Sequence, residues 1–198
     1  MTTVFFDLET GGLKIEQPII QLAAIAIDDE WRELATFEAK IQFDFRAADP
    51  AALELNHYDA AVWRAEAIPA ATAVQRFSRF LDPYRCFQRK SKRPPFRKYT
   101  VAQLAGHNAA TFDGDRLKAL YKAHDAFLGA DPRILDTFQL GLWHFHGKGE
   151  PENYKLGTLC KAFGIEFGDD AHDALYDVRK TAELARVMLA TPRGQVAA

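Results

Sequence analysis

Three strand-like segments follow one another within the first 43 residues, and they constrain the fold more than any other feature of the sequence. Val4–Glu9 is a short apolar run that ends before a pair of glycines, and Pro18–Ile27 is a longer run rich in isoleucine. Asp28–Glu30 is typical of a turn, and apolar residues alternate with polar ones within Trp31–Phe43. The short connections predict an antiparallel meander.

Helices and short strands alternate along the rest of the chain. A helix is predicted to begin at Pro50, because proline suits the first turn of a helix. Further helices are predicted at Ala70–Leu81, Phe112–Phe127, Thr137–Phe145, Leu156–Phe163 and His172–Leu189, and further strands at Val101–His107 and Arg133–Leu135. This order predicts an α/β fold with a mixed sheet flanked by helices. We expect a single domain at residues 1–192 and a frayed tail at 193–198.

The composition argues against a membrane-spanning or disulfide-rich protein. No stretch is long and apolar enough to cross a membrane, and the N-terminus lacks the basic segment and apolar run of a secretory signal. Only two cysteines occur, Cys86 and Cys160, so we expect a cytoplasmic protein without a disulfide framework. The net charge of −2 does not by itself indicate nucleic-acid binding, but carboxylates gathered around divalent cations would also give an acidic balance.

Two carboxylates interrupt the first apolar strand. Asp7 and Glu9 are two residues apart, so both side chains leave the same face of a strand. Carboxylates are costly to bury without a counter-charge, and a hard divalent cation such as Mg²⁺ would supply one. The alternative is that both side chains lie at an exposed strand end and are solvated. The pair alone does not decide between the two interpretations.

Two further acidic segments follow a strand or begin a helix. Asp113 comes after the strand that ends at His107–Asn108, where sites collect in α/β sheets, but an Asp at a helix start is also a common cap. Asp115 competes with Asp113, and spacing does not separate them. His172 and Asp177 are five residues apart, so they converge only if His172 lies in the loop or the first turn of the last helix.

Together these segments supply the groups that two-metal phosphodiester hydrolysis requires. The four carboxylates and the one base are Asp7, Glu9, Asp113, Asp177 and His172. In this chemistry carboxylates hold two ions about 4 Å apart. The ions stabilise the attacking and leaving oxygens, and the base takes a proton from the attacking water. Each segment is a weak indication alone, but the combination is specific.

The same segments resemble the motifs of the DEDDh, or DnaQ-like, 3′→5′ exonucleases of the ribonuclease H-like superfamily. Residues 6–13, Phe-Asp-Leu-Glu-Thr-Gly-Gly-Leu, resemble the first motif. Residues 107–113, His-Asn-Ala-Ala-Thr-Phe-Asp, resemble the second, in which an aromatic precedes the metal-binding Asp, and this favours Asp113 over Asp115. Residues 172–177, His-Asp-Ala-Leu-Tyr-Asp, resemble the third. Two further segments resemble the family, Asp136–Thr137 and residues 156–165.

This resemblance spans nearly the whole chain, and it implies a fold and an activity. The fold would be a mixed five-stranded sheet, an antiparallel meander followed by parallel strands, flanked by helices. The activity would be metal-dependent removal of nucleotides from the 3′ end of DNA or RNA, more often single-stranded. The cofactors would be two Mg²⁺ or Mn²⁺ ions. The resemblance leaves a homodimer possible, because some members of the family are dimers.

The resemblance also implies a role for each matched residue. Asp7, Glu9 and Asp177 would hold the first metal. Asp7 would also reach the second, with Asp113 acting mostly through water, and His172 would be the general base. Contacts to the substrate would come from Thr10, Gly11, Leu13, Asn56, His107 and Asn108. Gly11 departs from the family, which often has a second Thr at this position.

A basic segment at residues 85–98 looks longer than a minimal domain of this family requires. It carries Arg85, Arg89, Lys90, Lys92, Arg93, Arg97 and Lys98, with Phe87 and Phe96 between them. Cations neutralise phosphates and aromatic rings stack on bases, so Lys90, Lys92 and Arg93 are candidate substrate contacts. The alternative is a solvated surface loop.

Three classes of function remain to be compared. The first is the 3′→5′ exonuclease. The second is a nucleic-acid-binding module that lost activity, but such a module has no physical need for all four carboxylates and the histidine. The third is a metal phosphohydrolase that acts on a small nucleotide, and comparing a mononucleotide ester with a long strand as substrate would distinguish it. No feature can be assigned to reading the 2′-hydroxyl, so DNA and RNA are both candidates.

Overall fold

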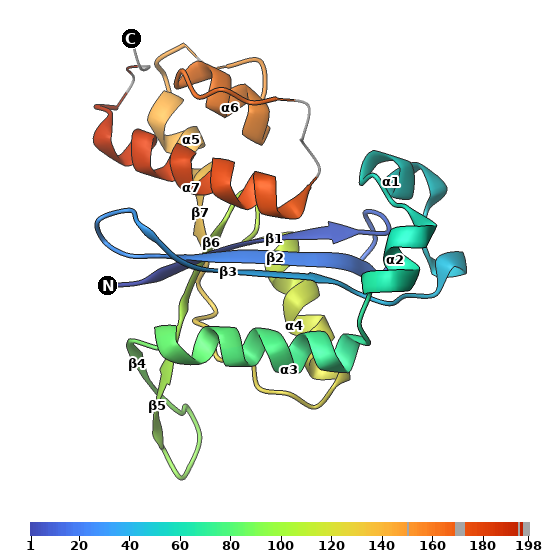
Figure 1. Ribbon diagram of the computed structural model, residues 1–198. Helices are drawn as coiled ribbons and strands as arrows, with labels where there is room; N and C mark the ends of the chain where they lie inside the picture. Colours follow the sequence, from blue (N-terminus) through green and yellow to red (C-terminus); the bar gives the residue numbers. More distant parts are fainter. Residues whose placement is uncertain (150, 169–172, 194, 196–198) are drawn as a thin grey trace.

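A mixed sheet of five strands runs through the centre of the structure (Figure 1). The computed structural model describes residues 1–149, 151–168, 173–193 and 195. The strands lie in the order β3-β2-β1-β6-β7, with bounds β1 Thr3–Thr10, β2 Ile19–Ile27, β3 Glu33–Lys40, β6 Gln103–Gly106 and β7 Leu135–Asp136. Strands β1, β2 and β3 are antiparallel neighbours, whereas β6 and β7 continue the sheet in parallel with β1. The predicted fold, a meander followed by parallel strands, is confirmed.

Helices cover both faces of this sheet. Their bounds are α1 Pro50–Leu55, α2 Ala60–Glu66, α3 Ala70–Leu81, α4 Asp113–Ala123, α5 Thr137–Phe145, α6 Leu156–Ala162 and α7 Ala174–Ala190. Figure 1 shows α5, α6 and α7 on one side of the sheet and α3 and α4 on the other. The short helices α1 and α2 lie near the end of the sheet to which β1 runs. No helix formed by the described residues is long and apolar enough to span a bilayer.

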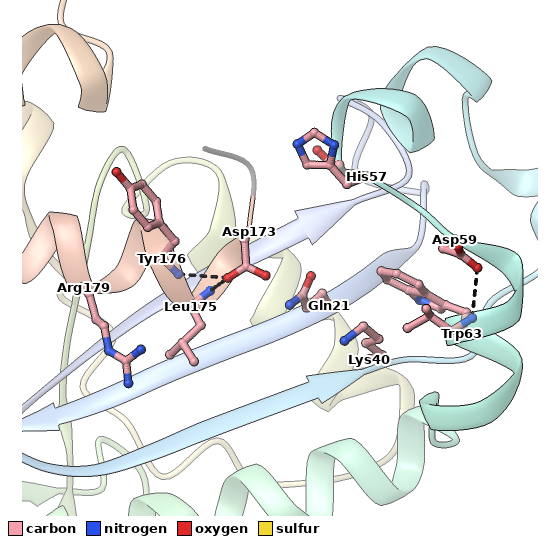
Figure 2. A pocket seen from close by; sticks show the side chains of 11 residues that line it. Gln21, Lys40, His57, Asp59, Trp63, Asp173, Leu175, Tyr176 and Arg179 are labelled. Atoms are coloured by element: carbon pink, nitrogen blue, oxygen red, sulfur yellow. Dashed lines mark hydrogen bonds between the residues drawn. The ribbon is translucent and has the colours of Figure 1, made fainter. Parts of the chain in front are cut away.

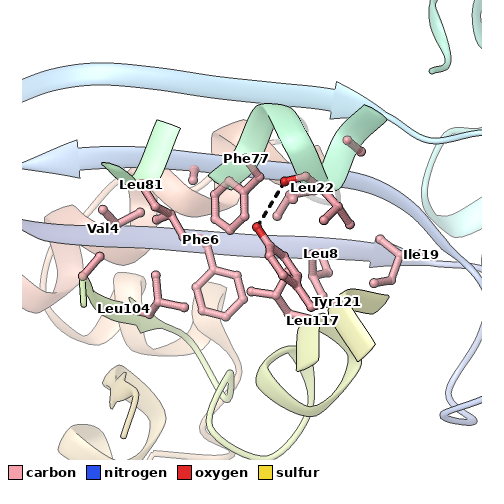
Figure 3. Packing of buried hydrophobic residues seen from close by; sticks show 14 of the residues in the cluster. Val4, Phe6, Leu8, Ile19, Leu22, Phe77, Leu81, Leu104, Leu117 and Tyr121 are labelled. Atoms are coloured by element: carbon pink, nitrogen blue, oxygen red, sulfur yellow. Dashed lines mark hydrogen bonds between the residues drawn. The ribbon is translucent and has the colours of Figure 1, made fainter. Parts of the chain in front are cut away.

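Alternation along β1 divides the core between the two helical layers. Val4, Phe6 and Leu8 point to the side of α3 and α4, where they share a buried cluster with Phe77 and Tyr121 (Figure 3). Residues of opposite parity point to the α7 side. Because both faces of β1 and β2 are covered, these strands read as nearly continuous apolar runs, which is typical of strands buried on two sides.

Several predicted elements keep their bounds, and others differ for local reasons. The helices predicted at Ala70–Leu81 and Thr137–Phe145 are confirmed at both ends. The helix predicted to reach Phe127 ends at Ala123, because Asp125 adopts a left-handed conformation with φ 50°. The third strand begins at Glu33 and not at Trp31, whose φ of 63° belongs to the turn.

Two predictions need correction, the loop at residues 85–98 and the single strand at Val101–His107. Residues 85–98 are more than a loop: β4 (Phe87–Lys90) and β5 (Lys98–Val101) form a two-stranded antiparallel hairpin. The strand predicted at Val101–His107 is in fact divided, with β5 ending at Val101 and β6 beginning at Gln103. Helix α2 was not predicted, because seven residues are too few to show a helical period clearly.

Candidate active site

The two carboxylates of β1 lie on the side of the sheet that α7 covers. Phe5 belongs to the same buried cluster as Ala174 and Val178 of α7. Asp7 and Glu9 have the same parity as Phe5, so they also point toward that helix. Glu9 is only 6% exposed. A solvated strand end, the alternative that the sequence left open, is therefore ruled out for Glu9.

The first turn of α7 supplies a third carboxylate. Asp173 is the N-cap, and its side chain accepts hydrogen bonds from two backbone amides of the first turn at 3.1 and 3.0 Å. This cap fixes where the helix begins, and Asp177 follows one turn later. One carboxylate oxygen from each of Asp7, Glu9 and Asp177 lies within 4.8 Å of the others.

Asp113 is the fourth predicted carboxylate, and the structure separates it from Asp115. Asp113 is the first residue of α4 and is 4% exposed, whereas Asp115 is on the surface and pairs with Lys118 at 3.0 Å. The N-cap position belongs to Phe112, so Asp113 is not the capping residue. Asp113 lies outside the group of three oxygens, yet it is near enough for its charge to raise the pKa of Asp7.

Burial and mutual repulsion raise the pKa values of three of these carboxylic acids, Asp7, Glu9 and Asp113. Burial, followed by the charges of Asp113 and Glu9, keeps the pKa of Asp7 well above its usual range. Burial, followed by the charges of Asp177 and Asp113, raises the pKa of Glu9 to about 8. Burial also raises the pKa of Asp113 to about 7, although the nearby Arg116 acts in the opposite direction. The cluster is therefore short of positive charge.

A hard divalent cation fits this donor set. Mg²⁺ and Mn²⁺ prefer carboxylate oxygens, and ligand oxygens on opposite sides of a Mg²⁺ ion are about 4 Å apart. Three oxygens within 4.8 Å of one another are thus close enough to share one ion. The cation would also offset the repulsion that raises the pKa values of Asp7 and Glu9. Asp7, Glu9 and Asp177 are the residues that could hold it.

The turn after β1 is tightly packed. The side-chain amide of Asn56 donates a hydrogen bond to the carbonyl oxygen of Thr10 at 2.9 Å. A Cβ on Gly11 would lie 2.7 Å from the Cβ of Ala48, so the threonine that the family often has here would not fit without movement. Leu13 is 84% exposed. The structure thus brings Thr10, Gly11 and Asn56 together at the end of β1 and leaves the Leu13 side chain exposed to solvent.

His107 and Asn108 follow β6, and hydrogen bonds fix both. The ring of His107 shares a hydrogen bond with the Thr137 hydroxyl at 2.9 Å, and its other nitrogen lies 3.0 Å from the Tyr154 carbonyl oxygen. Burial lowers the pKa of His107, which favours the neutral ring. Asn108 has φ 55°, and its backbone N–H donates to Asp136 at 2.9 Å. Both residues therefore hold the loop between β6 and α4 in place.

A pocket of about 600 Å³ opens between the α1–α2 segment and the start of α7 (Figure 2). Glu9 pairs with Gln21 across β1 and β2, and Gln21 pairs with Lys40 across β2 and β3. This cross-strand row connects the carboxylate cluster to the pocket. The pocket is lined by Gln21, Lys40, Asn56, His57, Asp59, Val62, Trp63, Asp173, Leu175, Tyr176 and Arg179. Sequence reasoning missed Gln21 and Lys40, because their places beside Glu9 depend on the pairing register of the three strands.

A second pocket, of about 690 Å³, also reaches the carboxylate cluster. Asp177 forms part of its wall together with His107 and Asn108. The basic side chains of Lys155 and Lys161 line it as well. The cluster is therefore bordered by two hollows, both of which include residues from the start of α7.

Two sets of predicted site residues are not brought to the cluster by the described structure. His172 lies outside the described residues, which resume at Asp173. Lys90, Lys92 and Arg93 belong to the β4–β5 hairpin and the turn between its strands. That hairpin lies near the N-terminal end of β1 (Figure 1), whereas Asp7 and Glu9 lie toward the other end of this strand.

The fold and the site define a class before any particular relative is considered. A ribonuclease H-like sheet with clustered carboxylates from β1 and α7 is the arrangement of a metal-binding nuclease domain. The family model RNase_T, described as "Exonuclease", matches residues 4–185, so the chain belongs to this exonuclease family.

Comparison with individual proteins supports the same fold. Over 86 residues, which are 43% of this chain and 6% of the relative, the chain is 38% identical to the DNA polymerase III PolC-type of Bacillus subtilis (strain 168). E. coli exonuclease I in complex with a dT13 oligonucleotide gives a TM-score of 0.72 at 20% identity, covering 97% of this chain and 41% of that one. The zinc-bound form of its complex with single-stranded DNA gives 0.74 at 20% identity, covering 96% and 40%. At this identity the likeness shows the fold alone, and the chain spans about two fifths of exonuclease I.

Proposed function

We propose that the chain is a metal-dependent 3′→5′ exonuclease that hydrolyses phosphodiester bonds at the 3′ end of DNA or RNA. The observation that carries the proposal is the convergence of Asp7, Glu9 and Asp177 within 4.8 Å in a member of an exonuclease family. The resemblance of the three sequence motifs to those of the DEDDh enzymes supports the 3′→5′ direction.

The carboxylates would divide the work of holding two ions. Asp7, Glu9 and Asp177 would hold one Mg²⁺ or Mn²⁺ ion, and Asp7 with Asp113 would reach the second. Bound there, the ions would stabilise charge on the attacking and leaving oxygens. The role of the fold is to hold four carboxylates close together. Their repulsion and burial raise the pKa values of Asp7, Glu9 and Asp113. A site of this kind is prepared for cations before the substrate arrives.

His172 is proposed as the general base. Its support is the third sequence motif, in which His172 directly precedes Asp173, the N-cap of α7. The role assigned to it is to accept the proton of the attacking water.

The 3′ end of the nucleic-acid substrate is proposed to lie across the carboxylate cluster, between the two pockets. Leu13, 84% exposed, is suited to pack against a terminal base, and Asn56 holds the Thr10 carbonyl beside it. The second pocket offers Lys155 and Lys161 for the phosphates that follow. Exonuclease I complexes with single-stranded DNA support single strands as the substrate class.

The proposal also covers organisation and location. Residues 1–192 are taken as one exonuclease domain. A cytoplasmic location is proposed because the chain has only two cysteines, Cys86 and Cys160.

A digestion panel tests this function directly. Strands of DNA and RNA, single and double, are labelled at the 5′ end and incubated with Mg²⁺ or with a chelator. We expect a ladder of shortening products that keep the label, and none with the chelator. An Asp7→Asn chain should give no ladder, whereas Asp115→Asn should match the parent, because Asp115 is a surface residue paired with Lys118. Release of the 5′-labelled mononucleotide as the first product would instead contradict the direction.

A further inference from the structure

We propose that the β4–β5 hairpin is a second nucleic-acid contact, remote from the carboxylates, that holds the backbone of strands long enough to reach it. The inference rests on the proposed function for the identity of the partner. It adds a binding surface of its own, with a phosphodiester backbone as the ligand and with no requirement for metal.

Charge is the first argument for this surface. Residues 87–101 carry six of the 25 Lys and Arg residues and no Asp or Glu, in a chain whose net charge is −2. Among the residues that the structure describes, no ion pair involves five of these cations, Lys90, Lys92, Arg93, Arg97 and Lys98. All five are exposed. The hairpin is therefore a concentrated positive patch on a protein whose remaining charge would repel a polyanion.

The sixth cation explains how the hairpin is held. Arg89 turns inward and forms an ion pair with Asp131, whose side chain is fully buried. Arg133 pairs with the same carboxylate at 3.1 Å. Asp131 thus anchors one strand of the hairpin to the segment before β7 and leaves the other cations facing outward. A charge that served only solubility would not need this anchor.

Exposed rings lie among the cations. Phe96 is 50% exposed, and the Lys90 ammonium lies 5.5 Å from the centre of its ring. Tyr99 is 39% exposed and packs edge-on against Phe127 with ring centres 5.8 Å apart. Rings interleaved with cations suit a single strand, because bases stack on the rings while phosphates meet the cations. An acidic protein segment would use the cations alone.

Position separates this surface from the catalytic cluster. The register pairs Thr3 with Gln103, and β5 ends before that point at Val101. Glu9 lies six residues further along β1, and that length of strand is roughly 20 Å. Figure 1 shows the hairpin projecting on the side of α3 and α4. Asp7 and Glu9 share the parity of Phe5, which packs with α7 on the other side of the sheet. A dinucleotide bound at the carboxylates cannot reach the hairpin, but a strand of twenty nucleotides can.

Binding without metal tests the surface apart from catalysis. An Asp7→Asn chain is titrated with a labelled single strand of twenty nucleotides in chelator at several salt concentrations. One variant adds Lys90→Gln, Lys92→Gln and Arg93→Gln. The matched control adds Arg76→Gln, Lys148→Gln and Arg186→Gln, three exposed cations outside the hairpin. Removing a cation that neutralises one phosphate lowers the slope of log K against log salt by about 0.7, so the hairpin variant should lose about 2 in slope and the control little.

A length comparison completes the test in the intact enzyme with Mg²⁺. The ratio of kcat/KM for the long strand to that for a dinucleotide should fall in the hairpin variant and stay at the parent's value in the control. Equal binding by the hairpin and control variants, with equal length ratios, would overturn the inference and leave the exonuclease proposal intact. If the parent protein hydrolyses no substrate but the hairpin substitutions still weaken binding of the long nucleic-acid strand, the exonuclease proposal is overturned and the hairpin inference stands.

Discussion

The guanidinium of Arg116 donates a hydrogen bond to the carbonyl oxygen of Leu13, 103 residues away in the sequence. The same group lies 3.5 Å from the centre of the Phe112 ring and donates a second bond to the Phe112 carbonyl at 3.3 Å. Arg116 belongs to α4, the helix that begins with Asp113. It therefore ties the loop that carries Leu13 to the helix that positions one carboxylate of the proposed site.

Replacing Arg116 by Gln should loosen the Leu13 loop and change how substrate binds. Losing a hydrogen bond from a charged donor costs about 1.5–3 kcal/mol of stability. We expect KM to rise more than kcat falls. Because the Arg116 charge lowers the pKa of Asp113, the acid side of the pH–rate profile should also move to higher pH. Kinetics across pH 5–9 and a thermal melt measure both effects, with Arg76→Gln as the surface control. An unchanged profile and an unchanged KM would contradict the positioning role.

Asp7→Asn should abolish turnover without loss of the fold. Asp7 is the residue proposed to reach both ions, and its burial beside Glu9 and Asp113 keeps its pKa well above the usual range. Removing one ionisable group from a repelling cluster relieves repulsion, so the metal-free variant should melt at the parent's temperature or higher. Thermal melts in chelator and the digestion panel measure the two outcomes. An Asp7→Asn variant that keeps the parent's activity would contradict the proposed mechanism.

The stability of the metal-free protein should fall as pH rises through the neutral range. The pKa of Glu9 is raised from 4.5 to about 8, so the folded state keeps a proton that the unfolded state releases above pH 4.5. The folded state therefore binds more protons between those values, and stability declines there by at most about 1.4 kcal/mol per pH unit for one group. Below pH 4.5 both states are protonated, and above pH 8 the loss is complete. Melts in chelator from pH 4 to 9 measure the decline, and Glu9→Gln should make it shallower by removing the contribution of Glu9 while those of Asp7 and Asp113 remain.

Metal binding should show the opposite pH dependence. A cation must displace the protons that burial and repulsion keep on Glu9 and Asp113, whose pKa values are about 8 and about 7. Affinity for Mg²⁺ or Mn²⁺ should therefore rise with pH up to about 8, and binding should release protons. Calorimetry in two buffers of different ionisation enthalpy measures the release. Binding that releases no protons at pH 7 would contradict the raised pKa values.

Local features of the fold were predictable because their causes lie within a few residues. Two-residue spacing places Asp7 and Glu9 on one face wherever the strand lies. The helix at Thr137–Phe145 begins directly after its N-cap, Asp136, whose side chain accepts a hydrogen bond from the backbone N–H of Phe138. The glycine that ends α6, Gly164, has φ 69°, a conformation that glycine adopts at little cost.

Other features could not be predicted, because their causes are distant in the sequence. The row from Glu9 through Gln21 to Lys40 depends on the pairing register of three strands. Arg116 is an ordinary helix residue until its hydrogen bond to Leu13 is known. The basic segment could be recognised by composition, but its anchor, Arg89 to Asp131, joins residues 42 apart and sets where the hairpin lies.

His172→Ala should slow hydrolysis by about 10²–10⁴-fold, the usual effect of removing a positioned base. Metal binding should persist, because His172 is assigned as a base and not as a ligand. The measurements are single-turnover rates and a metal titration, with His124→Ala as a control on an exposed histidine at the end of α4. Loss of metal binding in the His172 variant would show that the residue is a ligand.

Asp113→Asn and Asp115→Asn form a matched pair two residues apart on the same helix. Asp113 is buried, and its charge raises the pKa values of both Asp7 and Glu9, whereas Asp115 is paired with Lys118 on the surface. Asp113→Asn should therefore lower kcat by about 10–100-fold, the usual cost of removing a group that supports a metal ion through water. It should also lower the pH at which Glu9 ionises, because one repelling charge is gone. Asp115→Asn should change kcat less than about twofold, since a surface ion pair contributes about 0–1 kcal/mol. Rates at saturating Mg²⁺ and the pH dependence of melting in chelator separate the two variants. Equal effects from both, or a larger effect from Asp115→Asn, would overturn the assignment of Asp113 to the site.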